Sequence, residues 1–98
     1  MSVLMTLRIQ GDPKAVEATD VETLTTITDR AMKHGLISHH FYGTETEILV
    51  IDEWPDEQSC QSFFQETPEI MEMMGRAGVT SQPTPEFWRH LDVKDDVG

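Results

Sequence analysis

The fold is decided by residues 47–64, which read Glu47-Ile-Leu-Val-Ile-Asp-Glu-Trp-Pro-Asp-Glu-Gln-Ser-Cys-Gln-Ser-Phe-Phe64. Residues 48–51 are all apolar and mostly β-branched, a composition typical of a strand that is buried on both faces. Pro55 ends such a strand because it has no N–H to donate to the sheet. Asp56 can then cap a helix by accepting a backbone N–H. The stretch therefore predicts a strand over residues 48–54, a corner and a helix.

The residues upstream predict two further strands and one helix. Residues 3–10 alternate apolar and mostly polar side chains, which is typical of a half-buried strand. A helix is predicted over residues 13–34. It begins with a capping aspartate and a proline at the first helical position, and a glycine ends it. Residues 36–42 form the second strand, joined to the third by a short turn. The length of that turn is uncertain by one residue, so the sequence leaves open whether His39 or His40 faces the helices.

Pro68 divides the helix that follows the third strand. The apolar side chains of this helix recur every three or four residues, which indicates one buried face. Because proline lacks an N–H, we expect two pieces, over residues 56–66 and 68–76, with Thr67 capping the second. The remaining residues are predicted to form a loop at 81–85, a fourth strand over 86–93 and a flexible tail over 94–98.

These elements have the order βαββαβ within one domain, residues 1–98. Right-handed crossovers place the first and third strands side by side, with both helices on one face of the sheet. The predicted fold class is therefore α+β, a ferredoxin-like plait with a four-stranded antiparallel sheet. The third strand would expose apolar side chains on the uncovered face, which soluble monomers avoid. We therefore expect a homodimer that buries this face.

The composition restricts the partners of the chain. It has 98 residues, a net charge of −11 and no cluster of Lys and Arg. Such a chain repels phosphate groups, so we expect no binding to nucleic acid or to an anionic membrane. The single cysteine, Cys60, excludes an internal disulfide and fits a reducing, cytoplasmic location. Its place on the buried helix face predicts an inert thiol.

From about residue 3 to residue 92 the chain resembles the dimeric α+β barrel superfamily, in particular the antibiotic biosynthesis monooxygenase-like proteins. The resemblance is carried by the strand at 48–54, by the following helix with Phe63 and Phe64, and by the βαββαβ order. It implies a dimeric α+β barrel with one ligand per subunit, bound in a cleft between sheet and helices. The family includes cofactor-free monooxygenases acting on polycyclic aromatics, haem-degrading enzymes and isomerases.

The haem-degrading branch of that family carries an Asn on the first strand and a Trp and a His on the second helix. This chain has no Asn on the first strand, and its second helix offers Phe63 and Phe64 followed by methionines. The histidines at 39, 40 and 90 also lack the spacing of a metal site. We therefore expect no haem, no flavin and no tightly bound transition metal.

His40 and Tyr42 are the candidate catalytic residues, because an imidazole beside a phenol can hold or deprotonate a phenolic substrate. The alternative is that these strand residues lie at an edge or at a dimer contact. Asp52 and Glu53 end the third strand on opposite faces, and either becomes a candidate general base if it is buried. Arg8 is expected to form an ion pair rather than to take part in catalysis.

Aromatic and flexible apolar side chains are predicted to shape a pocket for a flat apolar ligand. The candidate ligand-binding residues are Trp54, Phe64, Met71, Met74 and Trp88. The alternative is that they pack the core or a dimer contact and leave no space for a ligand.

Two functions are consistent with this pattern. The first is a cofactor-independent monooxygenase, or a related enzyme, acting on a small aromatic or polyketide-like substrate. The alternative is a non-catalytic dimer that binds a small apolar ligand or has a structural role. A cavity in which polar groups converge favours the enzyme, whereas a filled core or a purely apolar cavity favours the alternative.

Overall fold

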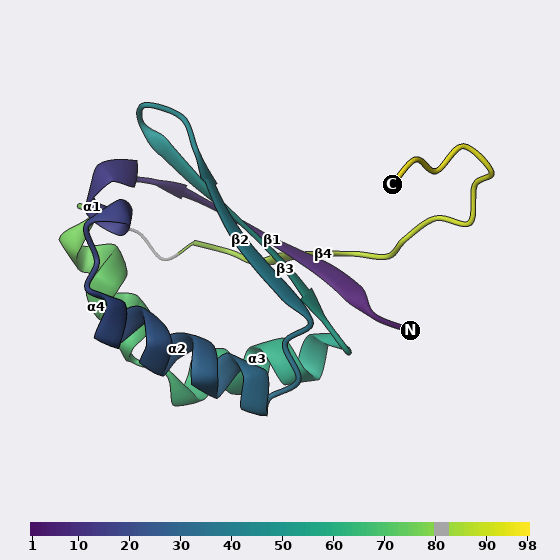
Figure 1. Ribbon diagram of the computed structural model, residues 1–98, viewed down its shortest axis with the longest axis horizontal. Coiled ribbons are helices and arrows are strands. Elements are labelled where there is room, and N and C mark those ends of the chain that lie inside the picture. The colour runs from purple at the N-terminus through teal and green to yellow at the C-terminus, as the bar shows by residue number, and fades with distance from the viewer. Residues whose placement is uncertain (80–82) are drawn as a thin grey trace.

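A four-stranded antiparallel sheet forms one layer of the molecule, and the helices form the other (Figure 1). The computed structural model describes residues 1–79 and 83–98. The strands follow the order β2-β3-β1-β4 in the sheet. The predicted α+β ferredoxin-like fold is therefore confirmed. The elements are β1 (Val3–Gln10), α1 (Pro13–Glu17), α2 (Val21–Lys33), β2 (Ser38–Gly43), β3 (Glu47–Trp54), α3 (Glu57–Glu66), α4 (Glu69–Arg76) and β4 (Glu86–Trp88).

The central strands β1 and β3 pair along their whole length, from Val3 opposite Trp54 to Gln10 opposite Glu47. Alternate β3 side chains, from Ile48 to Trp54, are buried against the helices. The intervening side chains are only half-buried. The single chain therefore leaves the second face of this strand uncovered, as expected, because the helices cover one face only (Figure 1).

The helix predicted over residues 13–34 is two helices, α1 and α2. The carboxylate of Asp20 accepts the backbone N–H of Thr23 at 2.8 Å and caps α2 at its start. Aspartate and threonine side chains compete for backbone hydrogen bonds in this way, which favours a new helix start over a continuous helix. Gly35, with φ of 95°, ends α2 as expected.

The break predicted at Pro68 lies between α3 and α4, so the two-piece helix is confirmed. The predicted cap is wrong by one residue. Pro68 itself occupies the N-cap position of α4, and no side chain supplies a capping hydrogen bond there. The hydroxyl of Thr67 is buried instead of reaching the helix start.

The sheet edges differ from the prediction in length. Strand β2 begins at Ser38 rather than at 36, and β4 contains three residues instead of eight. Strand β4 runs antiparallel to β1 and therefore approaches the first residues of β1 as it proceeds. Trp88 already lies opposite Leu4, close to that end of β1, so few residues remain for β4 to pair with. The residues that follow Trp88 are exposed and run past the sheet, away from the helices (Figure 1). Two residues of the predicted loop, Ser81 and Gln82, lie outside the described residues.

The hydrophobic core lies between the two layers. Cys60 is fully buried in this core, and burial raises the pKa of its thiol to about 12. The remaining core is apolar and comes from both central strands and from helices α2 to α4. Its main members are Met5, Leu7, Ile9, Ala31, Ile48, Val50, Trp54, Phe63, Ile70, Met74 and Ala77.

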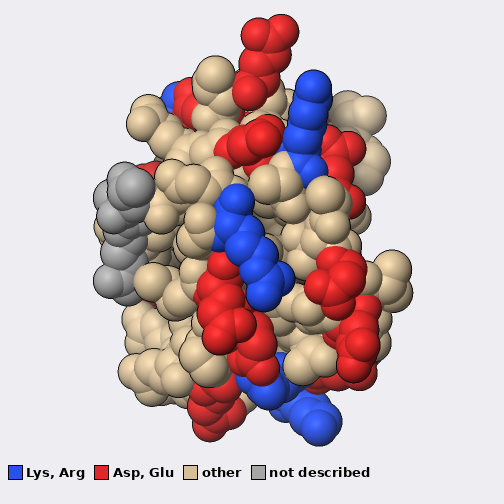
Figure 2. Space-filling model, turned by 90° about the vertical axis from the view of Figure 1, so that its left-hand side faces the viewer, with Lys and Arg blue, Asp and Glu red and all other residues tan. Residues whose placement is uncertain are grey.

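Acidic side chains dominate the outer surface at one end of the molecule. On the face seen in Figure 2, Lys and Arg side chains stand singly among Asp and Glu side chains. The described part of this face therefore presents no continuous basic surface to a phosphate backbone. In the described residues, no helix combines the length and the apolar composition that crossing a membrane requires.

Candidate functional site

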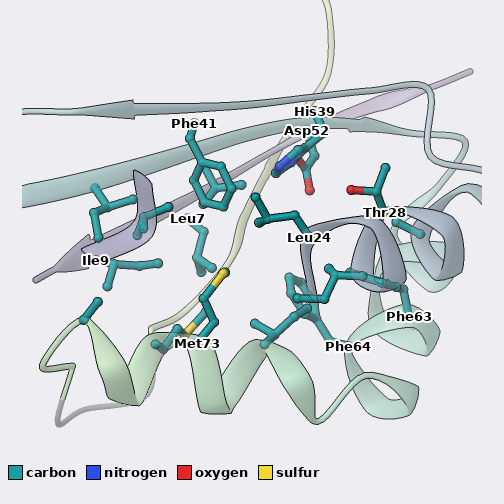
Figure 3. A pocket seen from close by; sticks show the side chains of 18 of the residues that line it. Leu7, Ile9, Leu24, Thr28, His39, Phe41, Asp52, Phe63, Phe64 and Met73 are labelled. Atoms are coloured by element: carbon teal, nitrogen blue, oxygen red, sulfur yellow. The ribbon is translucent and has the colours of Figure 1, made fainter. Parts of the chain in front are cut away.

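A cavity of about 70 Å³ lies between the sheet and the helices. Its lining side chains come from β1, β2 and β3 on one side and from α2, α3 and α4 on the other, and they point toward one another in Figure 3. The walls are mostly apolar, which favours the binding of an apolar ligand. The labelled apolar residues are Leu7, Ile9, Leu24, Phe41, Phe63, Phe64 and Met73.

One ionisable pair lies in this apolar lining. His39 on β2 and Asp52 on β3 are direct partners in the sheet, and His39 Nδ1 lies 2.6 Å from Asp52 Oδ1. Asp52 is only 5% exposed. The hydroxyl-bearing Thr28 of α2 lies across the cavity from the pair (Figure 3). Three polar side chains therefore converge in a cavity that is otherwise apolar.

Local structure explains the geometry of the pair. Strand β3 alternates between the two faces, so Asp52 falls on the buried face with Val50 and Trp54. A buried carboxylate requires a hydrogen-bond partner, and the register supplies His39. The ring of Phe41 packs edge-on against the imidazole, with 4.8 Å between ring centroids. These contacts restrict the orientation of the imidazole.

The pair has the chemistry of a general base. An ionised carboxylate only accepts hydrogen bonds, so His39 Nδ1–H donates to Asp52. The neutral imidazole then carries its lone pair on Nε2, where it can accept a proton from a ligand. The negative charge of Asp52 stabilises the imidazolium that this transfer creates.

The structure separates the predicted ligand-binding residues. Phe64 and Met74 line the cavity. Trp54 is fully buried and packs on Phe63, with 5.4 Å between ring centroids, and it is absent from the cavity lining. Met71 lines a second hollow, together with Leu7 of β1 and the prolines that precede β4, and Trp88 is 51% exposed on the open face of the sheet. These five residues therefore do not form one pocket.

His40 and Tyr42 lie on the open face of the sheet, opposite the cavity. Their partners on β3 are Ile51 and Leu49, which share that face. Neither residue therefore lines the cavity with Phe64. Their catalytic role stays a prediction, and any chemistry they perform takes place on the open face.

One signal in the sequence pointed to the pair. Two carboxylates end the third strand, and either was a candidate general base if it proved to be buried. Asp52 is the buried one. Glu53 is half-buried on the open face, where it accepts a hydrogen bond from Ser2 Oγ at 2.5 Å. The face of His39 depended on the register of the hairpin, which the sequence left open. No pattern in the sequence singled out Thr28.

Other ionic contacts lie outside the cavity. Arg8 pairs with Glu47 on the open face, with Nε 2.6 Å from Oε2, so the predicted ion pair forms within the chain. Arg30 of α2 pairs with Glu69 of α4 at 2.5 Å. His34, the C-cap of α2, contacts Glu66 of α3 at 2.6 Å. Across residues 1–79 and 83–98, no three His, Cys, Asp or Glu side chains group closely enough to hold a metal ion.

No family model matches the chain, and no curated protein sequence matches it. Solved structures do match. A conserved protein from Methanosarcina mazei Go1 has a TM-score of 0.66 and 16% identity, over 91% of this chain and 92% of its own. SnoaB, a cofactor-independent oxygenase from Streptomyces nogalater, has a TM-score of 0.65 and 11% identity, over 97% of this chain and 98% of its own.

An antibiotic biosynthesis monooxygenase has a TM-score of 0.60 and 10% identity, over 93% of this chain and 99% of its own. At these identities the likeness shows the fold alone. The predicted resemblance to the antibiotic biosynthesis monooxygenase proteins is therefore confirmed at the level of the fold.

Proposed function

We propose that the protein is a cofactor-independent monooxygenase that acts on a small aromatic, polyketide-like substrate. The observation that carries the proposal is the His39–Asp52 pair, a general-base arrangement in the wall of an apolar cavity. The shared fold with SnoaB supports the same reading. In this proposal His39 is the base, and Asp52 is a positioning residue that acts through it.

The chemistry begins with a proton transfer. His39 Nε2 takes a proton from a CH₂ group that lies beside an aromatic ketone, and the resulting carbanion is delocalised over the ring and the carbonyl. This electron-rich anion reduces O₂. The CH₂ group becomes C=O, with a loss of two hydrogens and four electrons. One oxygen atom enters the product, the other leaves as water, and O₂ accepts the four electrons.

The apolar walls assist this reaction by lowering the polarity around the pair. Beside such walls, the attraction between the carboxylate and the imidazolium is less screened than in bulk solvent. The walls also bury the ring system of an aromatic ligand, which contributes roughly 25 cal/mol per Å² of apolar surface. The pair therefore supplies the base, and the walls supply the affinity.

We further propose that the protein is a homodimer that pairs the open faces of two sheets. The support is the apolar character of that face, which carries Leu4, Leu49 and Ile51 at its centre, with Tyr42 and Trp88 more than half exposed. An exposed apolar patch of this kind marks an interaction surface. A two-fold dimer buries it on both copies at once.

Oxygen uptake tests the proposed reaction. The probe is anthrone, a three-ring aromatic ketone with an acidic CH₂ group, and the protein is first treated with a chelator. We expect uptake above the buffer rate. His39→Gln should lower this uptake by roughly a hundredfold or more. His90→Gln is the matched control, because His90 is an exposed histidine that does not line the cavity, and it should leave the rate unchanged. His40→Gln tests the alternative site on the open face of the sheet.

Other outcomes are equally informative. Loss of uptake in His40→Gln but not in His39→Gln would move the site to the open face, where His40 and Tyr42 lie. Binding of anthrone without uptake above the buffer rate would favour the non-catalytic ligand-binding protein.

A further inference from the structure

The exposure of its lining side chains shows where the cavity opens. All of these side chains belong to described residues, and among them only Thr28 of α2 and Phe41 of β2 are exposed. By contrast, every lining side chain of β1, β3 and α4 is buried. The half-buried Leu24 of α2 lies beside these two residues (Figure 3). The opening therefore lies between α2 and β2, and we call it the mouth, bordered by Leu24, Thr28 and Phe41.

The imidazole of His39 lies just inside the mouth. Its side chain is 31% exposed, whereas the side chain of its partner Asp52 is 6% exposed. Phe41 packs edge-on against the imidazole from one side, and Leu24 lies across from it (Figure 3). A ligand that enters through the mouth therefore meets the imidazole before it reaches the apolar interior.

The cavity is too small to admit an aromatic ring without a change of shape. Its volume is about 70 Å³. An apolar cavity that holds benzene measures roughly 150 Å³, about twice as much. Closely packed walls transmit strain rather than compress. A ring can therefore enter only if one wall of the cavity moves away from the others.

Helix α2 is tied to the other helices through its C-terminal end. Arg30 Nη1 donates to the backbone carbonyl oxygen of Glu66 at 3.3 Å and pairs with Glu69 Oε1 at 2.5 Å. His34 Nε2 lies 2.6 Å from Glu66 Oε2. We call these four residues the clasp. Glu66 ends α3 and Glu69 begins α4, so the clasp joins α2 to both sides of the break between these helices.

The side of α2 that borders the mouth has no such tie. Among the described residues, no hydrogen bond or ion pair joins α2 to β2. A joint also lies at each end of the helix: the chain breaks before the N-cap residue Asp20, and Gly35 has a φ of 95°. Residues at the ends of elements absorb the backbone changes of a lid motion. Helix α2 can therefore move away from β2 as one unit.

We propose that α2 is a lid over the cavity and that ligands enter between α2 and β2. The clasp holds the C-terminal end of α2 on α3 and α4, while the N-terminal half moves away from β2 and widens the mouth. The inference rests on the proposed function for the choice of an aromatic ligand. The position of the mouth and the one-sided attachment of α2 do not depend on it.

Thr28→Trp tests the mouth. The probe is 2-naphthol, a two-ring phenol whose fluorescence is separate from that of tryptophan, and binding is followed by stopped flow. A larger side chain at the mouth should slow association and dissociation alike, each by about tenfold or more, and change the Kd by less than about twofold. Thr25→Trp is the matched control, because Thr25 is an exposed threonine of the same helix that does not line the cavity.

Three results would overturn the mouth. The first is equal association rates in Thr28→Trp and Thr25→Trp. The second is a weaker affinity in Thr28→Trp with an unchanged association rate, which would make Thr28 part of the binding wall. The third is a parent protein that does not bind 2-naphthol.

The concentration dependence of binding tests the lid. A ligand that waits for the lid binds no faster than the lid opens, so the observed rate should level off as the concentration of 2-naphthol rises. Arg30→Met and Glu69→Gln loosen the clasp from its two sides and should each raise this limiting rate by about threefold or more. Lys33→Met, which leaves the clasp in place, should not change it. A rate that rises in proportion to concentration, or one limiting rate shared by Arg30→Met and Lys33→Met, would overturn the lid.

The lid and the monooxygenase fail in different ways. Binding of 2-naphthol that depends on Thr28 and on the clasp, without oxygen uptake from anthrone, keeps the lid and rejects the monooxygenase. Oxygen uptake that is equal in Thr28→Trp and Thr25→Trp at low anthrone concentration keeps the monooxygenase and rejects entry between α2 and β2.

Discussion

His39 Nδ1 and Asp52 Oδ1 lie 2.6 Å apart because the two residues are direct partners on β2 and β3. Side chains that face each other in an antiparallel pair point to the same side of the sheet. Both therefore point toward the helices. The hydrogen bond satisfies a carboxylate that is otherwise buried among apolar side chains.

Asp52→Asn should keep the fold and lower anthrone oxidation by roughly tenfold or more. Asparagine still accepts the hydrogen bond from His39 Nδ1, but it lacks the charge that stabilises the imidazolium. Oxygen uptake and the melting temperature are measured together. The double variant His39→Leu with Asp52→Leu is the control for stability and should melt close to the parent, since removing both partners leaves no unpaired group. A rate in Asp52→Asn equal to that of the parent would exclude Asp52 as the positioning residue.

Ile51→Lys should convert the protein from a dimer to a monomer. Ile51 lies at the centre of the open face, between Thr6 and His40, where a dimer would bury the added charge. Sedimentation at micromolar concentration should give about twice the chain mass for the parent and the chain mass for the variant. Met32→Lys is the control, since Met32 is an exposed residue of α2 and its substitution should leave the dimer intact. A parent protein that sediments as a monomer would rule out the dimer.

Arg30→Met should weaken the protein most near neutral pH. The hydrogen bond from Arg30 holds the pKa of Glu69 below its ordinary value of 4.5. A carboxyl whose pKa is lower in the folded state stabilises the fold above its unfolded pKa, and this contribution is lost as the pH falls through the folded pKa. The difference in melting temperature between parent and variant should therefore be largest above pH 4.5 and should shrink below it.

Lys33→Met is the matched control for this experiment. It removes a cation from the last turn of the same helix, α2, and leaves the Arg30–Glu69 pair in place. Its effect on the melting temperature should be smaller and should not follow the titration of Glu69. A constant difference between Arg30→Met and the parent across this pH range would contradict the contribution of the ion pair.

The thiol of Cys60 should be inert in the native protein. It is fully buried, and burial raises its pKa to about 12, so the thiolate is scarce at any pH the fold tolerates. A disulfide reagent at about pH 8 should react rapidly only after unfolding in urea. Cys60→Ala should give no signal in either state. Rapid reaction of the native protein would show that α3 opens readily.

The sequence predicted the elements whose signals are local. The apolar run of β3, the alternation of β1 and the break at Pro68 depend on residues next to one another in the chain, and all three elements lie where they were expected. The sequence did not predict the split between α1 and α2, because none of the residues around Asp20 is one that a continuous helix excludes. What divides them is the hydrogen bond from Thr23 to the Asp20 carboxylate, which competes with helix continuation.

The candidate site was harder to predict because it depends on register. A shift of one residue in the β2–β3 pairing would place His40 opposite Asp52 and would turn His39 to the open face. Strand β2 lies at the sheet edge and has no buried residue, so its pattern does not reveal which face is inside. The turn decides instead. Thr44 there accepts hydrogen bonds from the backbone of Thr46 and Glu47, which fixes the pairing.

The polar pair of the cavity comes from a single hairpin, in which His39 and Asp52 are 13 residues apart. Hairpins depend on local contacts and form within roughly 1–10 μs, whereas the pairing of β1 with β3 joins distant parts of the chain. The pair can therefore assemble early in folding, before helices α2 to α4 enclose it. The same separation places the proposed base in one hairpin and much of the cavity wall in the helices, so a substitution in the helices can change the outline of the cavity without touching the pair. In the proposed enzyme, ligand preference and reactivity therefore depend on separate stretches of the chain.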